Sequence, residues 1–133
     1  MGSAILACVA GLVLPALLIP VVAFTGHSEW VEELAKAAAV LLLVLTVPGR
    51  TRPLAVGTAF GFLFGLSENA LYLNQVFQAG TIPAFWERFA WTLPMHVLTG
   101  VLLTASGLWG KKFLPLGFAA ALGLHLLFNR LAA

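Results

Sequence analysis

Long apolar runs alternate with short polar breaks along the whole chain, and five of these runs are long enough to form helices that cross a membrane. A spanning α-helix needs about 20 mostly apolar residues, the length that crosses the hydrocarbon core of a bilayer. The connections between the runs are short. We therefore expect one all-α domain over residues 1–133, a polytopic membrane helix bundle. Its five transmembrane helices are predicted at residues 4–24, 29–47, 53–77, 83–109 and 113–131.

Composition supports a membrane protein and excludes a nucleic-acid partner. The chain is 61% hydrophobic and 9% charged, whereas a soluble domain carries about 25% charged residues. A formal net charge of +2, with no basic run longer than Lys111-Lys112, is too small for a nucleic-acid binder. The single cysteine, Cys8, cannot form an internal disulfide. The lipid bilayer is the partner that these features predict.

The basic residues in the loops predict which side of the membrane each loop faces. Arg50 and Arg52 lie between the second and third predicted helices, and Lys111 and Lys112 lie between the fourth and fifth. Cytoplasmic loops carry an excess of Lys and Arg, so both loops should face the cytoplasm. We expect a multi-pass protein of the cell membrane with its N-terminus inside and its C-terminus outside. Arg130 near the C-terminus is a single basic residue against these four.

Ionisable and amide side chains interrupt four of the predicted helices at positions where a membrane helix normally has none. An ionisable side chain inside a bilayer costs about 3 kcal/mol on insertion scales. One such residue can be an accident of packing, but carboxyl clusters and imidazoles on four different helices suggest a functional site. The residues are Glu32, Glu33, Lys36, Glu68, Asn69, His96, His125 and Asn129.

These residues agree in depth and in the helix faces that they occupy. At a helix rise of about 1.5 Å per residue, the polar residues of all four helices lie between the bilayer midplane and the outer surface. Glu68 shares a face of its helix with Gly57 and Gly61, and glycines at this spacing let a neighbouring helix approach closely. His125 and Asn129 are four residues apart on one face. We therefore predict that most of the polar residues lie within about 10 Å of one another, a distance that one or two waters can bridge.

Each polar residue also has an interpretation without a function. Glu32 and Glu33 can complement the helix dipole near a helix N-terminus, and Lys36 can extend its ammonium group to the membrane surface. A lone histidine such as His96 is usually a core residue with satisfied hydrogen bonds. Arg88 can pair with a carboxylate at the outer interface. Convergence of these residues is the property that separates a site from such individual interpretations.

The order of the polar motifs resembles that of the PrsW family of intramembrane proteases, which belongs to the wider group containing the CAAX prenyl endopeptidases. Together the motifs extend over most of the chain, and each lies on a separate predicted helix. The resemblance implies an intramembrane endopeptidase that cleaves a membrane-anchored protein substrate. Because these polar residues are expected in the outer half of the bilayer, we expect the catalytic pocket to open toward the extracytoplasmic side. The motifs are Glu32-Glu33-x-x-Lys36, Phe64-x-x-x-Glu68-Asn69, His96, and His125-x-x-x-Asn129.

The resemblance also implies roles for the residues. A glutamate of the first motif would activate the attacking water, and the other glutamate and Lys36 would hold it in place; which of Glu32 and Glu33 is the base stays open. His125 and Asn129 are expected to donate to the developing oxyanion or to orient the water. The candidate catalytic residues are Glu32, Glu33, Glu68, His96, His125 and Asn129, and the supporting residues are Lys36, Asn69 and Arg88.

The same side chains suit other chemistry. His96 is expected to shuttle a proton and Glu68 to fix a histidine tautomer, but Glu33, Glu68, His96 and His125 would also make an acceptable zinc shell. No His-Glu-x-x-His spacing is present, and a metal-free glutamate mechanism, which requires no cofactor, is the favoured hypothesis. Two other classes stay open. Intramembrane ionisable residues also form proton relays in small ion-translocating proteins, and the glycine face is compatible with a non-catalytic membrane scaffold.

Overall fold

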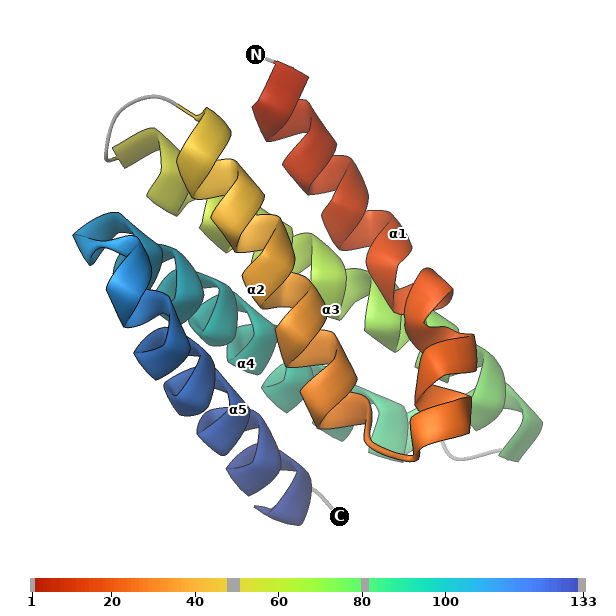
Figure 1. Ribbon diagram of the computed structural model, residues 1–133. Coiled ribbons are helices and arrows are strands. Elements are labelled where there is room, and N and C mark those ends of the chain that lie inside the picture. Colours follow the sequence, from red (N-terminus) through yellow and green to blue (C-terminus); the bar gives the residue numbers. More distant parts are fainter. Residues whose placement is uncertain (1, 48–50, 80–81, 132–133) are drawn as a thin grey trace.

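The computed structural model describes residues 2–47, 51–79 and 82–131, and they form a bundle of five α-helices (Figure 1). The described residues include no strand, so the predicted all-α fold is confirmed. One short 3-10 turn, η1, precedes the last helix. The elements are α1 (Gly2–Thr25), α2 (Ser28–Thr46), α3 (Thr51–Ala79), α4 (Ile82–Trp109), η1 (Lys111–Phe113) and α5 (Leu114–Leu131).

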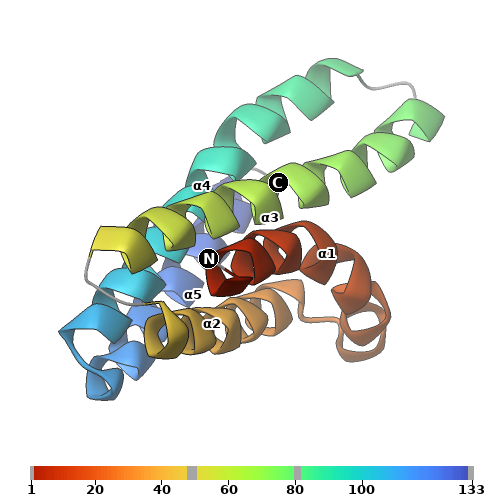
Figure 2. The same cartoon turned by 90° about the horizontal axis from the view of Figure 1, so that it is seen from above.

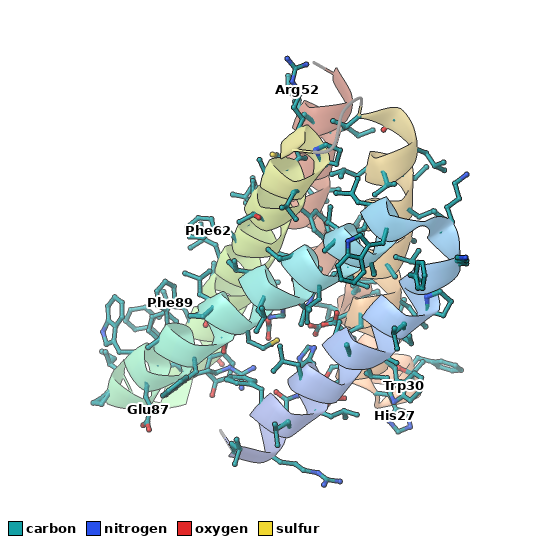
Figure 3. All side chains as sticks on the ribbon, turned by 90° about the vertical axis from the view of Figure 1, so that its left-hand side faces the viewer. His27, Trp30, Arg52, Phe62, Glu87 and Phe89 are labelled. Atoms are coloured by element: carbon teal, nitrogen blue, oxygen red, sulfur yellow. The ribbon has the colours of Figure 1, made fainter. Side chains whose placement is uncertain are left out.

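Consecutive helices run in alternating directions, so each loop lies at one of the two ends of the bundle. The N-terminus and Arg52 lie at one end, and His27, Glu87 and the C-terminus lie at the other (Figures 1 and 3). We call these the basic end and, because the positive charges of the loops predict that it faces outward, the outer end. Arg50, which the orientation argument also used, lies outside the described residues.

Within the part of the chain that the structure describes, four helices are long and apolar enough to cross a membrane. These are α1, α3, α4 and the segment Lys111–Leu131 that contains α5. The helix predicted at residues 29–47 is present as α2, which is less apolar than these four because it carries four charged residues within its 19 residues. The packing of α2 explains how it accommodates these charges. It contacts α1, α3, α4 and α5, and its charged side chains Glu33 and Lys36 are buried among them.

The predicted glycine face brings α3 and α4 into close contact. A Cβ atom at Gly57 would collide with the Thr104 side chain, and one at Gly61 would collide with the main-chain carbonyl of His96. A Cβ at Gly65 would lie 3.0 Å from Cδ2 of the His96 ring. The glycines therefore allow α4 to approach α3 closely, and they position His96 against the middle of α3.

We expect Gly61→Val to destabilise the bundle, because the added side chain must push the α4 backbone away from α3. Overpacking of this kind costs about 1–3 kcal/mol, and more where the obstacle is main chain. Gly123→Val is the matched control, since a Cβ atom at Gly123 meets nothing within 4 Å and the change in helix propensity is the same. Reversible unfolding in mixed detergent micelles measures both variants; equal free energies of unfolding would contradict this packing account.

The outer ends of α3 and α4 extend beyond the rest of the bundle. These helices have 29 and 28 residues, against 19 and 18 in α2 and α5, so the difference corresponds to about 15 Å of helix. Figure 2 shows the α3–α4 hairpin standing away from the other helices. We call residues 72–79 and 82–91 the hairpin tip. It carries an aromatic cluster of Phe85, Trp86 and Phe89, with ring centroids 5.2 to 5.9 Å apart.

Candidate functional site

Polar side chains from four helices meet near the middle of the bundle, and this convergence was predicted from the sequence. Lys36 Nζ on α2 lies 2.6 Å from Glu33 Oε1 and 2.7 Å from Nδ1 of His96 on α4. Nδ1 of His125 on α5 lies 2.9 Å from the same Glu33 oxygen. His96 Nε2 is hydrogen-bonded to Glu68 on α3. The predicted convergence is therefore confirmed, and we call these residues, with Glu32, the polar cluster.

Lys36 holds the centre of the cluster. Its side chain has no exposed surface, so the alternative in which it extends to the membrane surface is wrong. Besides Glu33 and His96, its ammonium group lies 3.4 Å from Thr99 Oγ1, which gives each of its three N–H groups an acceptor. The ammonium also lies 4.6 Å from the centroid of the Phe64 ring, within the range of a cation–π interaction.

The neighbours of the two histidines determine where their protons lie. Because the Lys36 ammonium has only protons to give, His96 Nδ1 must accept, and His96 Nε2–H donates to Glu68. His125 Nδ1–H donates to Glu33. The free nitrogen of His125, Nε2, lies 4.0 Å from Glu32 Oε2.

The two adjacent glutamates occupy different environments. Glu33 has no exposed surface, and its Oε1 accepts from both Lys36 and His125. Glu32 lines a cavity of about 340 Å³ between α1, α2 and α3, together with Glu68. Glu32 Oε2 is buried and has no hydrogen-bond partner among the described residues. A bound molecule would therefore meet Glu32 and Glu68, whereas Glu33 serves to hold Lys36 and His125.

The cluster is not electrically balanced when both histidines are neutral. Three carboxylates, on Glu32, Glu33 and Glu68, face two cations, on Lys36 and Arg88. An unpaired buried charge is costly, so the cluster favours one additional positive charge. One proton shared between Glu32 and His125, or a bound cation, would supply it.

Arg88 on α4 closes the cluster on the side of the hairpin tip. One of its terminal nitrogens lies 3.3 Å from Glu68 Oε1, and its guanidinium lies 4.4 Å from the centroid of the Tyr72 ring. Its Nε–H is buried without a hydrogen-bond partner among the described residues. Arg88 therefore contacts the cluster directly and also retains a free donor.

The two asparagines lie outside the hydrogen-bonded cluster, contrary to the prediction for Asn129. Asn129 Nδ2 donates to Glu29 Oε1 at 2.8 Å, one turn closer to the outer end than the His125–Glu33 bond. Because α2 and α5 run antiparallel, a step of four residues outward on each helix repeats the same pairing. Asn69 is buried and donates to the carbonyl of Gly65 on its own helix at 2.7 Å. Neither amide N–H is directed at the polar cluster.

Two residues that complete the cluster lie outside the predicted set. Thr99 accepts from Lys36, and Tyr72 supports the guanidinium of Arg88. Both signals are present in the sequence, since Thr99 is three residues after His96 and Tyr72 is four residues after Glu68. These spacings place each of them on the same face as a predicted site residue.

The carboxylates and one histidine lie close enough together to be compared with a metal site. Donor atoms of Glu32, Glu68 and His96 lie within 4.8 Å of one another, so the set differs from the predicted Glu33, Glu68, His96 and His125. A histidine that binds zinc through Nε2 donates its Nδ1–H to a neighbouring acceptor. Here Nδ1 faces the Lys36 ammonium, which is itself a donor. The cluster therefore does not fit zinc while Lys36 is charged.

Comparisons with models of protein families, with curated proteins and with solved structures give no match.

Proposed function

We propose that this chain is a multi-pass protease of the cell membrane that hydrolyses a peptide bond in a membrane-anchored protein substrate. The observation that carries the proposal is the placement of Glu32. Its side chain lines a cavity, and its Oε2, which is buried without a hydrogen-bond partner among the described residues, lies 4.0 Å from His125 Nε2. The order of motifs that resembles the PrsW family supports the same reaction class.

The spacing between Glu32 and His125 suits one water molecule. Two polar atoms 4.0 Å apart can both hydrogen-bond a water at about 2.8 Å. The proposed reaction requires Glu32 as the carboxylate and a proton on His125 Nε2. Glu32 then takes a proton from the water as the oxygen bonds to the substrate carbonyl carbon, and His125 Nε2–H donates to the carbonyl oxygen. Glu32 returns its proton to the leaving amine as the C–N bond breaks.

Glu33 and Lys36 position these groups without touching the substrate. Glu33 orients His125 through Nδ1, and Lys36 holds Glu33 ionised through the bond at 2.6 Å. The same Lys36 fixes the His96 tautomer that donates to Glu68. Pre-organised partners of this kind lower the reorganisation needed in the transition state.

A library of single-span reporter proteins tests the proposal without knowledge of the natural substrate. Each reporter carries a randomised segment across the outer membrane boundary, and the purified protein is reconstituted with the library in lipid vesicles. We expect release of the outer fragment from a subset of reporters, whereas vesicles without the protein release none. Absence of release from every reporter would refute the proposed protease activity.

We expect cleavage to be independent of added or removed metal, because the Lys36–His96 contact opposes metal binding at His96. Incubation with a strong membrane-permeant chelator should leave the cleavage rate unchanged, and elemental analysis should find no stoichiometric zinc. Loss of activity on chelation that zinc restores would replace the metal-free mechanism with a metal-dependent one.

A proton relay is the second candidate, because the hydrogen bonds from His125 through Glu33, Lys36 and His96 to Glu68 form a continuous chain. A relay that moves protons across a membrane must extend along the membrane normal. At about 1.5 Å per residue, the members of the chain lie between about 15 and 26 Å from the basic end of their helices. The chain therefore crosses the bundle sideways, which favours catalysis over transport.

The proposed orientation predicts where water-soluble reagents can reach. In a Cys8→Ser background, a single cysteine at Gln78 should be outside and one at Lys111 should be inside, because Lys and Arg favour the cytoplasmic side. Both side chains are exposed in the bundle. An impermeant maleimide added to intact cells should label the cysteine at Gln78 and leave the one at Lys111 unlabelled. The reverse labelling would move the polar cluster to the cytoplasmic half.

A further inference from the structure

Two cavities border the α3–α4 hairpin, and two members of the polar cluster line one of them. The first, of about 340 Å³, is bounded by α1, α2 and α3 and contains Glu32 and Glu68. The second, of about 590 Å³, is bounded by α3, α4 and α5 and contains Arg88. Tyr72 lines both. We call them the α1-side cavity and the α5-side cavity.

The two cavities meet at one pair of side chains. Glu68 in the α1-side cavity is bonded at 3.3 Å to Arg88 in the α5-side cavity. Arg88 belongs to the hairpin tip, which stands away from the other helices in Figure 2. A ligand that extends from one cavity to the other would therefore pass the Glu68–Arg88 pair.

From this arrangement we infer that the two cavities are the halves of one substrate groove, which holds an extended peptide with its scissile bond beside Glu32 and Glu68. The inference rests on the proposed protease function and adds the position and side-chain preferences of the substrate. Both volumes are within the range of about 300–1,000 Å³ typical of ligand sites.

The free donor of Arg88 favours a peptide over a lipid tail as the occupant. An extended peptide in an apolar setting carries main-chain carbonyl groups that need a donor. Arg88 lines the α5-side cavity, and its Nε–H is buried without a partner among the described residues, so a rotation of the guanidinium on peptide binding would bring that donor to a main-chain carbonyl. An acyl chain has no acceptor to satisfy it.

The two halves differ in chemistry, which gives the substrate a direction. The α1-side cavity is walled mainly by aliphatic side chains, whereas the α5-side cavity combines Trp91 and Phe128 with the charged residues Glu87 and Arg88. The membrane-spanning, aliphatic part of the substrate therefore fits the α1 side, and its polar juxtamembrane part fits the α5 side. The apolar residues of the α1-side cavity are Pro15, Leu18, Ile19, Val22, Ala23 and Leu71.

The way α1 packs explains why the α1-side cavity lies near the outer end of the bundle. Ser67 Oγ on α3 donates to the carbonyl of Leu12 at 2.7 Å, and Gly11 packs closely against the backbone of Phe60. Both contacts lie in the half of α1 nearer the basic end. The cavity-lining residues of α1 begin at Pro15 and continue toward the outer end. α1 is thus attached to α3 in one half and forms a wall of the groove in the other.

Photocrosslinking tests the groove directly. The photoreactive residue p-benzoylphenylalanine is placed singly at Val22 or Phe128 in a Glu32→Gln background and mixed with a reporter that the wild-type protein cleaves. Val21 and Leu127 are the adjacent controls, because they are exposed and line neither cavity. We expect Val22 to crosslink to the aliphatic side of the cleavage position and Phe128 to the polar side. Crosslinks from one cavity alone, or equal crosslinking from the controls, would overturn the groove.

A kinetic variant gives a second, independent test. Ala84→Trp places a large side chain in the α5-side cavity, whereas Ala90→Trp on the same helix is exposed and lines neither cavity. We expect Ala84→Trp to raise KM by about tenfold with little change in kcat, the signature of lost ground-state binding. Cleavage by both variants with equal KM would refute the groove and leave the proposed protease function standing, whereas no cleavage by the wild-type protein would refute the function itself.

Discussion

Replacing Glu32 by glutamine is expected to lower the rate of peptide hydrolysis by at least about 10²–10³-fold, the usual cost of removing a general base. Glutamine keeps the size and polarity of the side chain but cannot accept the proton of the attacking water. The loss should appear mainly in kcat, because the substrate groove is unchanged. Single-turnover cleavage of a reporter in vesicles measures it.

Glu29→Gln is the matched control for this variant. It makes the same chemical change one turn away on α2, at a residue whose carboxylate contacts Asn129 and not the polar cluster. We expect it to retain wild-type cleavage. Equal loss in the two variants would indicate a general effect of charge on α2 and would remove Glu32 from the proposed role of base.

Replacing Lys36 by methionine is expected to destabilise the bundle by about 3–5 kcal/mol, the cost of removing one partner from a buried ion pair. Methionine fills a similar volume, but it leaves the buried carboxylate of Glu33 without its cation and His96 Nδ1 without its donor. Reversible unfolding in mixed micelles measures the free energy of unfolding. Lys112→Met is the control, because Lys112 is exposed.

A double variant distinguishes a charge effect from a packing effect. Adding Glu33→Gln to Lys36→Met removes the buried carboxylate that has lost its cation, so the double variant should recover part of the stability that Lys36→Met loses. Additive losses in the double variant would show that Lys36 contributes through packing alone. That result would contradict the central place of the Lys36–Glu33 pair in the cluster.

The lengths of the apolar runs were sufficient to predict the all-α fold, because a segment in lipid must satisfy its backbone hydrogen bonds within its own helix. The same argument did not anticipate how α2 accommodates four charged residues in its 19 residues. In α2, residues such as Glu33 and Lys36 are shielded by the neighbouring helices, which is a property of packing that run length does not contain. The glycine face of α3 was predictable from spacing because a 3.6-residue period fixes which residues share a face.

The candidate site was predictable as a cluster but not as a set of bonds. The depth of the polar residues along their predicted helices, and the helix faces that they share, indicated that Glu33, His96 and His125 converge. They did not indicate the register between α2 and α5, which pairs Asn129 with Glu29 and removes it from the cluster. The distinct surroundings of Glu32 and Glu33 also depend on three-dimensional packing, because adjacent residues differ by about 100° around a helix and only one of them faces the α1-side cavity.

Cleavage in water labelled with heavy oxygen tests the central claim most directly. The wild-type protein and Glu32→Gln are each reconstituted with the same reporter, and the fragments are analysed by mass spectrometry. We predict that the wild-type protein produces one new C-terminal carboxyl group that contains heavy oxygen, at a position near the outer membrane surface, and that Glu32→Gln produces almost none. An uncleaved reporter with the wild-type protein, or equal labelled product from both proteins, would contradict hydrolysis by the polar cluster.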